Sequence, residues 1–455
     1  MIRKILIANR GEIAVRIIRT CREMGIQTVA VYSTADKDAL HAQLATEAVC
    51  IGSPRSADSY LNVNNIIQAA VNTGCDAIHP GFGFLSENGD FARKVQENGL
   101  IFVGPSPDLI DKMGNKAEAR RLMKEAGVPI VPGSEGVVET VEDGLKKADE
   151  ITYPLMIKAA GGGGGKGIRI VRSADEFPAA FMAARSEALA NFGNGDVYME
   201  KFIENPKHIE VQIIADCFGN VVHLYDRDCS FQRRNQKMIE EAPCFSLSEE
   251  TRQTITADAV KACRYVGYNS VGTVEFLLDK NGQHYFMEMN TRIQVEHPIT
   301  EMVCGIDIVK WQIRAANRQR LTITQQDIKP SGYAMECRIN AENVKQGFVP
   351  SPGRIEFMHL PGGRGVRVDT AVYTGYEIPP FYDSMILKLI TFAPSRLECI
   401  RKMRAALEEL IIDGIETNID FHYFVLHHKK FVDGSYDTSF AGTFIEELKQ
   451  NEYVV

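Results

Sequence analysis

The first hundred residues alternate short β-rich runs with amphipathic stretches, and this rhythm limits the chain to few folds. In the stretch 12–24, Ile13, Ile17 and Cys21 recur every four residues, which gives a helix one apolar face. Strands that alternate with such helices pack as an open parallel sheet. We therefore expect an α/β protein. The β-rich runs that set the rhythm are 4–8, 28–32, 77–79 and 101–103.

The bulk properties predict a globular protein of more than one domain. A chain of 455 residues exceeds one ordinary domain, and 45% hydrophobic with 24% charged residues excludes a largely disordered chain. A formal net charge of -8 argues against a nucleic-acid partner, because nucleic-acid surfaces cluster Lys and Arg. No run reaches the ~18 apolar residues of a membrane span, and no signal-peptide pattern opens the sequence. We expect a soluble, cytoplasmic protein without a membrane partner.

Breaks in the pattern divide the chain into three expected domains. Residues 1–115 form a Rossmann-like domain that contains the parallel sheet. A charged helix ends near Gly127 and a Pro-Gly pair follows, so a small, mobile second domain is expected at 130–203. Residues 204–455 form a C-terminal domain of mixed α+β structure. Within the last two domains, strands are expected at 155–158, 168–171 and 197–203, and helices at 174–189 and 397–410.

A run of five glycines, Gly161 to Gly165, lies between Lys158 and Lys166. Consecutive glycines let backbone N–H groups approach a polyanion without obstruction by side chains, and the lysines add positive charge. The spacing to a terminal Lys-Ser/Thr pair that defines a P-loop is missing. A flexible linker is the alternative, but linkers usually mix in serine and other polar residues. We expect a loop that covers phosphates.

Two β-rich runs, 271–278 and 283–289, are joined by a good hairpin turn, Asp279-Lys280-Asn281-Gly282. If Leu278 pairs with Gln283, Glu275 lies opposite Phe286 and Glu288 is its diagonal neighbour, while Asn290 continues the same face. Two adjacent carboxylates repel each other unless a cation lies between them, and oxygen ligands suit Mg2+. The alternative is a solvated hairpin face with an incidental acidic pair. We expect a metal site.

The segment after this hairpin carries Arg292, Gln294 and Glu296, which continue the even-numbered alternation if the chain stays extended. A guanidinium, an amide and a carboxylate together suit the binding and deprotonation of a small planar oxyanion. A salt-bridged surface strand is the alternative. The neighbouring metal-like hairpin favours an anion site.

Six motifs lie in order along almost the whole chain: 8–14 (ANRGEIA), 79–88 (HPGFGFLSEN), the glycine run, 227–234 (RDCSFQRR), 288–298 (EMNTRIQVEHP) and 336–342 (ECRINAE). This set resembles the biotin carboxylase family of ATP-grasp enzymes. Other ATP-grasp enzymes share the glycine loop and the metal carboxylates but not the last two motifs. The resemblance implies an ATP-grasp fold: an N-terminal open parallel sheet, a small glycine-loop lid and a C-terminal α+β domain.

The resemblance also implies which residues bind each reactant. Phosphate and ribose would be contacted by Lys116, Lys158 and His208, and adenine by Glu200, Lys201, Ile203 and Leu277. The glycine loop would contribute Gly163, Gly164 and Gly165. Two further residues, Gln232 and Glu275, would lie on the ATP side. Mg2+, or Mn2+ in its place, would be held by Glu275, Glu288 and Asn290. Bicarbonate would be held by Lys237, Arg292, Gln294, Val295 and Glu296. The biotin pocket would be lined by Phe82, Gly83, Gln294 and Arg338.

The mechanism implied by the resemblance begins when Glu296 deprotonates bicarbonate, which attacks the γ-phosphate of ATP to give carboxyphosphate. That intermediate breaks down to CO2 and phosphate, phosphate takes the ureido N1 proton of biotin, and Arg338 stabilises the enolate. Two departures from the family pattern stand near the site. Asn235 replaces a histidine of many members and is assigned no nucleotide contact, and Phe82 replaces a frequent tyrosine, so it keeps packing but no hydroxyl hydrogen bond.

The chain has no Met-Lys-Met type of biotin-attachment turn, so the biotin is expected on a separate carrier protein. The expected partners are this biotin carboxyl carrier protein, carboxyltransferase subunits and a second copy in a homodimer. The expected pathway is fatty acid biosynthesis through acetyl-CoA carboxylase. The alternatives are the corresponding subunit of a pyruvate or other acyl-CoA carboxylase, a different ATP-grasp ligase, and a non-catalytic nucleotide-sensing subunit.

Overall fold

The structure is a computed structural model that describes residues 1–134, 136–159, 168–192 and 195–450. By the contacts among its residues the chain divides into two units. The first unit comprises Met1–Val128, Lys207–Phe276 and Glu288–Val455, and the second comprises Pro129–Pro206 and Leu277–Met287. The predicted lid, 130–203, therefore falls within the second unit. The division into three domains stays a prediction.

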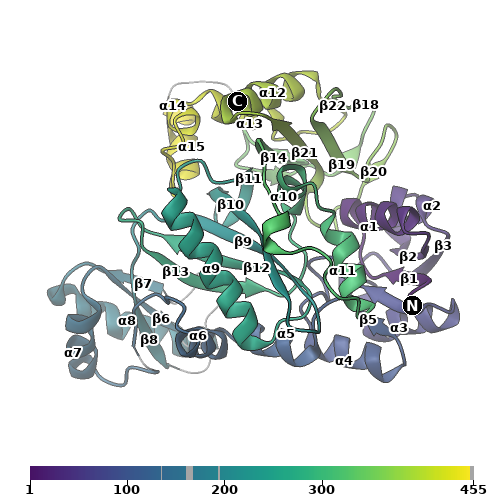
Figure 1. The fold of residues 1–455 in the computed structure, drawn as a ribbon. Coiled ribbons are helices and arrows are strands. Elements are labelled where there is room, and N and C mark those ends of the chain that lie inside the picture. Colours follow the sequence, from purple (N-terminus) through teal and green to yellow (C-terminus); the bar gives the residue numbers. More distant parts are fainter. Residues whose placement is uncertain (135, 160–167, 193–194, 451–455) are drawn as a thin grey trace. The chain divides into compact units, whose positions relative to one another are not determined.

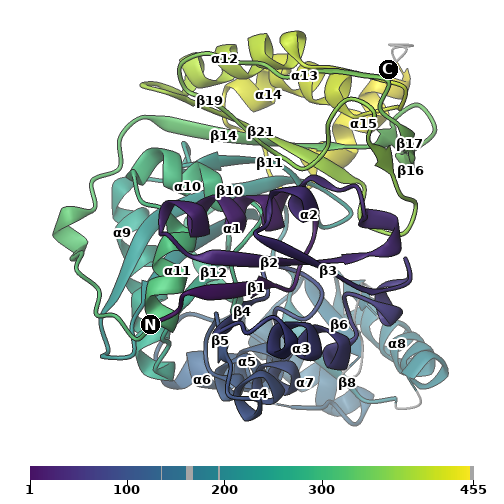
Figure 2. The same ribbon diagram turned by 90° about the vertical axis from the view of Figure 1, so that its right-hand side faces the viewer.

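The N-terminal part of the first unit contains the predicted open parallel sheet. Its strand order is β3-β2-β1-β4-β5, and every neighbouring pair is parallel. Figure 2 shows α1 on one face of this sheet and α3 and α4 on the other. The expected apolar stripe is confirmed, because Ile13, Ile17 and Cys21 are all buried in one core cluster. The elements are β1 (Lys4–Ile7), α1 (Gly11–Glu23), β2 (Gln27–Ser33), α2 (Leu40–Leu44), β3 (Glu47–Gly52), α3 (Val63–Asn72), β4 (Ala77–His79), α4 (Gly89–Glu97), β5 (Ile101–Phe102), α5 (Pro107–Gly114) and α6 (Lys116–Glu125).

The chain also forms an eight-stranded sheet of order β13-β12-β9-β10-β11-β14-β21-β19, which belongs to the first unit except for residues 277–287 of the β12-β13 hairpin. The pairings of β10 with β9 and β11, of β14 with β11 and β21, and of β21 with β19 are antiparallel. Figures 1 and 2 show α12 and α13 along the β14-β21-β19 end of this sheet. The long strands are β9 (Lys207–Ala215), β10 (Val221–Arg233), β11 (Gln236–Ala242), β12 (Val271–Leu278), β13 (His284–Asn290), β14 (Tyr333–Asn340), β19 (Val366–Thr370) and β21 (Met385–Ala393).

Helices and short strands complete this unit. The predicted helix at 397–410 is confirmed within one residue at each end as α12. The helices are α9 (Glu249–Val266), α10 (His297–Cys304), α11 (Ile308–Ala316), α12 (Arg396–Glu409), α13 (Ile419–His427), α14 (Lys429–Val432) and α15 (Phe440–Gln450). The short strands are β15 (Glu342–Asn343), β16 (Val349–Pro350), β17 (Gly353–Arg354), β18 (Phe357–His359), β20 (Glu377–Ile378) and β22 (Ile411–Asp413).

The second unit has a three-stranded antiparallel sheet of order β7-β6-β8 and a core of its own. Its elements are α7 (Val141–Ile151), β6 (Leu155–Ala159), β7 (Ile168–Val171), α8 (Phe177–Phe192) and β8 (Val197–Lys201). The helix expected from residue 174 begins instead with a 3-10 turn, Ala174–Glu176, followed by α8. Phe177 and Phe181 of α8 stack with ring centroids 5.8 Å apart, and both belong to the same buried cluster as Ile157 of β6.

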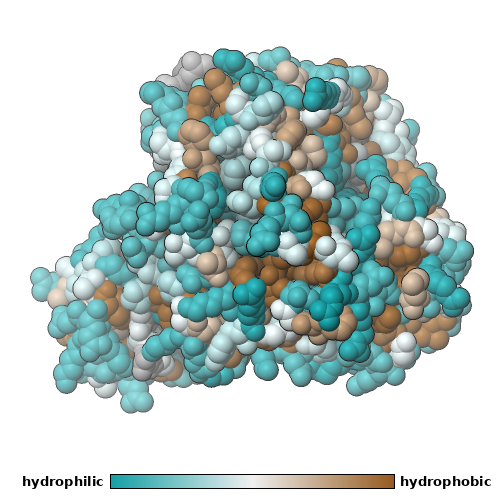
Figure 3. Space-filling view, in the orientation of Figure 1, coloured by the Kyte–Doolittle hydropathy of each residue, from teal (hydrophilic) through white to brown (hydrophobic). Residues whose placement is uncertain are grey.

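Among the described residues, no helix is both long and apolar enough to cross a membrane. On the face drawn in Figure 3, hydrophilic side chains predominate and hydrophobic ones form smaller clusters.

Candidate active site

A buried ammonium group lies at the centre of the predicted site. Burial lowers the pKa of Lys237, but the surrounding carboxylates raise it by more, so it lies well above the ordinary 10.5 and the side chain stays charged. Without this cation the carboxylates would repel one another in a medium of low polarity. Its Nζ atom lies 2.6 Å from Glu210 Oε2, 2.9 Å from Glu275 Oε1 and 2.6 Å from Glu296 Oε1.

Neighbouring strands explain why these groups meet. In the order β12-β9-β10-β11-β14, residues far apart in the sequence occupy adjacent strands. Figure 1 shows β10, β9 and β12 running side by side. The strand residues of the site are Glu275 on β12, His208 and Glu210 on β9, Arg227 and Gln232 on β10, Lys237 and Glu240 on β11, and Arg338 on β14.

Glu296 is wholly buried and is held by two cations. Besides its contact with Lys237, its Oε2 atom accepts a hydrogen bond of 3.0 Å from Arg338 Nη2. Arg338 Nε also donates to Glu240 Oε1 at 2.6 Å, so the guanidinium bridges two carboxylates. Burial raises the pKa of Glu296, but Lys237 and Arg338 lower it by more, so it lies well below the usual 4.5. The carboxylate is ionised and able to accept a proton.

Glu275 is the second anchor of the site. His208 Nε2 lies 2.8 Å from its Oε2 atom, and the side-chain amides of Asn290 and Gln294 donate to Oε1 at 2.9 and 2.8 Å. Gln232 Nε2 donates to the other ring nitrogen of His208 at 3.1 Å. Burial raises the pKa of Glu275, but Lys237 and His208 lower it by more, so it lies well below its ordinary value.

The predicted metal residues, Glu275 on β12 and Glu288 and Asn290 on β13, lie near one another on the hairpin that these two strands form. Glu288 is 38% exposed, and its Oε2 atom lies 3.8 Å from Lys116 Nζ. Burial and then the charge of Glu275 raise the pKa of Glu288, as expected for two close carboxylates. A divalent cation would relieve that repulsion, and the oxygens of Glu275, Glu288 and Asn290 are the donors Mg2+ prefers. These residues fit the metal.

The segment after β13 differs from the prediction of an extended alternation. β13 ends at Asn290, and the chain then turns so that Glu296 becomes the N-cap of α10, with φ −80 and ψ 8. Arg292 Nε donates to Glu87 Oε2 at 2.8 Å, and Nη2 donates to Asn290 Oδ1 at 2.9 Å. Gln294 and Glu296 reach one cluster through this turn and not through strand parity. The extended-strand prediction was wrong, whereas the predicted grouping of Gln294 and Glu296 with Glu275 is present.

The residues predicted for the biotin pocket lie partly in the N-terminal domain. Phe82 packs against the core cluster beneath α1, and its carbonyl accepts from Asn9 Nδ2 at 2.7 Å. Gly83 has a φ of +65 in the turn before α4. In the described part of the chain, neither residue forms a hydrogen bond with Arg338, so their role stays a prediction.

The remaining predicted nucleotide residues belong to the second unit. Lys158 on β6 forms an ion pair with Glu200 on the adjacent β8. Lys201 Nζ donates to Thr152 Oγ1 and to the carbonyl of Tyr153, each at 2.8 Å. Ile203 follows β8, and Leu277 lies in the hairpin part of this unit. The glycines Gly163, Gly164 and Gly165 lie outside the described residues.

Comparison with known proteins gives the same assignment over nearly the whole chain. Residues 1–110 match the biotin carboxylase N-terminal domain, and residues 336–443 match the biotin carboxylase C-terminal domain. Residues 115–324 match the ATP-binding domain of the carbamoyl-phosphate synthase L chain. "Biotin carboxylase 1" of Bacillus subtilis is 57% identical over 445 residues, which cover 98% of this chain and 99% of that protein. The chain belongs to the biotin carboxylase family.

Solved structures of this family agree with the fold. A biotin carboxylase of Campylobacter jejuni, in complex with a β-γ-ATP ligand, has a TM-score of 0.91 at 48% identity, covering 97% of this chain and 99% of that one. The biotin carboxylase domain of a thermophilic 2-oxoglutarate carboxylase, bound to bicarbonate, has a TM-score of 0.93 at 49% identity, covering 99% of this chain and 98% of that one. The expected ATP-grasp fold and the assignment as a biotin carboxylase are confirmed.

Sequence reasoning missed three buried residues that this biotin carboxylase site depends on. Glu210 and Arg227 form an ion pair with both side chains wholly buried, and Glu240 holds Arg338. Glu210 stands inside the largely apolar strand β9, where a charged residue is rare unless it is paired, whereas Arg227 and Glu240 lie among other charged residues of β10 and β11. That signal was available, but the partner of each charge lies on another strand and cannot be read from a single sequence.

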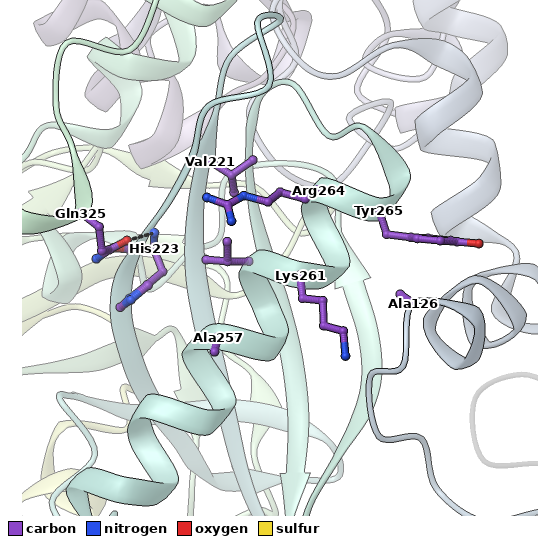
Figure 4. A pocket seen from close by; sticks show the side chains of 9 residues that line it. Ala126, Val221, His223, Ala257, Lys261, Arg264, Tyr265 and Gln325 are labelled. Carbon is purple, nitrogen blue, oxygen red and sulfur yellow. Dashed lines mark hydrogen bonds between the residues drawn. The ribbon is translucent and has the colours of Figure 1, made fainter.

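A groove of about 560 Å³ lies elsewhere on the first unit and contains no predicted site residue. Figure 4 shows Lys261, Arg264 and Tyr265 projecting from α9 along it. Lys261 Nζ donates to the carbonyl of Gly127 at 2.7 Å, and Tyr265 Oη donates to Glu125 at 2.9 Å. The groove is lined by Ala126, Val221, His223, Ala257, Val260, Lys261, Arg264, Tyr265 and Gln325.

Proposed function

We propose that this biotin carboxylase uses ATP and bicarbonate to carboxylate biotin carried on a separate protein, as the first half-reaction of acetyl-CoA carboxylase. One observation carries the proposal: the ionised Glu296 lies buried between Lys237 and Arg338. A carboxylate and two cations in one enclosed place suit both the binding of a small oxyanion and the removal of its proton. The relatives named biotin carboxylase support it.

The residues of the site would divide the chemistry as follows. Lys237 and Arg292 attract bicarbonate, and Glu296 takes its proton while a bicarbonate oxygen bonds to the γ-phosphorus and the bond to ADP breaks. When the anion binds Lys237, that cation is shared, and the pKa of Glu296 rises towards the range in which a base is effective. Bound Mg2+ would neutralise charge on the phosphates, and Glu275, Glu288 and Asn290 would hold it.

The second stage carboxylates biotin. Carboxyphosphate breaks down to CO2 and phosphate, phosphate accepts the ureido N1 proton, and the enolate attacks CO2. Arg338 would stabilise the enolate oxygen through its guanidinium, which Glu240 holds in place. Because carboxyphosphate hydrolyses readily, the reaction needs a site from which water is excluded. We propose the glycine-loop domain as the lid.

The partners and the pathway are the finer part of this proposal. We propose a biotin carboxyl carrier protein and carboxyltransferase subunits as partners, fatty acid biosynthesis as the pathway and the cytoplasm as the location. A related biotin carboxylase domain was solved as a dimer, which supports a homodimer here. Analytical ultracentrifugation tests this, with twice the mass of one chain as the expected result and the mass of one chain as the contrary one.

A second candidate differs only in the final acceptor. The 2-oxoglutarate carboxylase small subunit of Hydrogenobacter thermophilus is 51% identical over 97% of this chain and 93% of that protein. The biotin carboxylase subunit of a pyruvate carboxylase matches at 51% identity, with 99% of each chain covered and a TM-score of 0.88. Carboxylation of acetyl-CoA, pyruvate and 2-oxoglutarate by the complex isolated with its partner subunits decides between these acceptors.

Biotin-dependent release of ADP, with bicarbonate present, tests the proposed half-reaction. We expect Glu296→Ala and Arg338→Ala to lose at least ~100-fold of the biotin-stimulated rate, the scale of a lost acid-base group, while they still bind ATP. Glu416→Ala is the matched control, because Glu416 is an exposed glutamate of the same unit. Unchanged activity of Glu296→Ala would remove the assignment of the base. Wild-type protein without biotin-dependent ADP release would overturn the function itself.

A further inference from the structure

The position of the Glu296 carboxylate depends on the turn that joins β13 to α10, and two side chains outside the reacting group hold that turn. Lys388 Nζ donates to the carbonyl oxygen of Val295 at 2.8 Å. His297 Nδ1 lies 2.8 Å from the carbonyl oxygen of Gln294, which can only accept, so this ring nitrogen carries the proton. Two successive carbonyls immediately before Glu296 are therefore fixed from the protein interior.

Lys388 is an unusual residue for such a position. It lies within β21 with no exposed surface, and its Nζ atom is 3.2 Å from Glu12 Oε2 on α1. Three further charged groups face it, the carboxyls of Glu336 and Asp369 and the guanidinium of Arg367. A buried ion pair contributes little net stability and can often be replaced by apolar residues of similar volume. Stability alone gives no reason for a lysine here, whereas its bond to Val295 does.

The direction of the two carbonyls fixes the direction of two N–H groups. In a trans peptide the C=O of one residue and the N–H of the next point to opposite sides. With the Val295 carbonyl turned toward Lys388, the N–H of Glu296 points away from it, and the N–H of Val295 likewise points away from the ring of His297. Among the described residues, neither N–H donates a hydrogen bond to another protein group. Two adjacent backbone donors are thus left available beside the Glu296 carboxylate.

We propose that Lys388, paired with Glu12, is a positioning residue: by holding the Val295 carbonyl it turns the Glu296 N–H group toward bicarbonate and fixes the Glu296 carboxylate beside the proton that it removes. This inference rests on the proposed function. Lys388 touches no reactant and acts only through the backbone of Val295. Its loss should disturb the use of bicarbonate and leave the use of ATP unchanged.

The test is the biotin-dependent release of ADP by Lys388→Met, a variant that keeps the length of the side chain and removes its donor. We expect kcat/KM for bicarbonate to fall at least about ten-fold, because a displacement of about 1 Å in a reacting group can cost about 100-fold. The KM for ATP should change less than about two-fold, since Lys388 contacts none of the predicted nucleotide residues. In Glu12→Gln the lysine keeps its bond to Val295, so a smaller loss is expected.

Lys402→Met is the matched control. Lys402 also donates to two backbone carbonyls, of Arg364 at 2.9 Å and Phe392 at 2.7 Å, but neither carbonyl adjoins a predicted site residue. We expect this variant to keep the wild-type kcat/KM for bicarbonate. An equal effect of Lys388→Met and Lys402→Met, or equal changes in the constants for ATP and bicarbonate, would overturn the inference.

Misfolding is controlled by a double variant. If Lys388→Met does not fold, Glu12→Gln combined with Lys388→Met removes both buried charges, and the same selective loss for bicarbonate is expected. Wild-type kinetics in the folded double variant would also reject the inference. These outcomes differ from failure of the proposed function, in which the unaltered protein itself shows no biotin-dependent release of ADP.

Discussion

At the residue scale, the site consists of charges that are removed from water and balanced against one another. Lys237 alone neutralises parts of three buried carboxylates, and Arg338 bridges two. Such groups are held at a cost in desolvation, and removal of one partner leaves the others uncompensated. The same arrangement sets the protonation states on which the chemistry depends. One of these carboxyls, Glu240, titrates in an accessible range.

We predict that Glu240 makes stability depend on pH. Burial raises its pKa to about 7, although Arg338 opposes this, and its ordinary value is 4.5. The folded state thus binds the proton more tightly than the unfolded state, so this stabilisation is complete below about pH 4.5 and is lost as the pH rises to about 7. Relative to Glu240→Gln, the free energy of unfolding should fall over that window in urea titrations. A difference that stays constant with pH contradicts the prediction.

At the scale of elements, the strands and the helix ends place the reacting groups. β12 and β13 carry Glu275, Glu288 and Asn290, while the turn into α10 brings Glu296 back to the same sheet. Helix ends in this unit follow local rules as well. Ser248 caps the start of α9 by accepting from Thr251 N at 3.1 Å, and Gly267 ends it with a φ of +67.

The metal site at the end of β13 gives a prediction for Glu288→Gln. Loss of one carboxylate oxygen should reduce the Mg2+-dependent part of ADP binding about ten-fold or more, while binding of ADP in EDTA stays unchanged. Isothermal titration with and without Mg2+ measures this. Glu416→Gln is the matched control and should behave like the unaltered protein. Equal Mg2+ dependence in Glu288→Gln and the control would remove Glu288 from the metal ligands.

The end of α9 gives a prediction about stability. A Cβ at Gly267 meets no atom within 4 Å, so Gly267→Ala should be destabilised by the left-handed backbone alone, by about 1 kcal/mol. Gly267→Asn should lose less stability, since asparagine tolerates that conformation.

Gly442 lies in α15 without a positive φ and also has open space where a Cβ would stand, so Gly442→Ala should be more stable by about 0.5–1 kcal/mol. Urea midpoints test both signs.

At the scale of the whole molecule, the chain contains separate hydrophobic cores in its two units. Phe181, 1% exposed, belongs to the core of the second unit, and Phe421, 0% exposed, belongs to the largest core cluster of the first. Units with their own cores need not unfold together. We therefore expect more than one transition in calorimetry.

Two matched substitutions test this expectation. Truncation of a buried phenylalanine to alanine costs about 3–5 kcal/mol, and the loss should fall on the unit that contains it. Phe181→Ala should lower the temperature of one transition, and Phe421→Ala should lower that of the other. A single transition that both variants shift equally would show that the two units unfold as one.

The sequence by itself determined the local structure and the kind of chemistry. The alternation of β-rich runs with amphipathic helices specified the parallel sheet. The turn at 279–282 specified the hairpin that carries Glu275 and Glu288, and the motifs in their order along the chain specified the family. These are features of short range, in which spacing along the chain fixes which side chains share a face. The predicted strand was continued too far along the sequence, to Glu296, because no residue pattern after Asn290 marks the turn strongly.

Only the tertiary structure decided which charges meet. Glu210 on β9, Glu240 on β11 and Arg338 on β14 are far apart in the sequence, and the sheet order β12-β9-β10-β11-β14 brings their strands together. Lys388 on β21 meets instead Glu12 of α1 and the turn before α10. A charged residue in a buried position indicates that an oppositely charged partner lies nearby, but which residue is that partner depends on how strands and helices pack across the fold. For the same physical reason the bond from Lys388 to Val295, 93 residues away, could be found only in three dimensions.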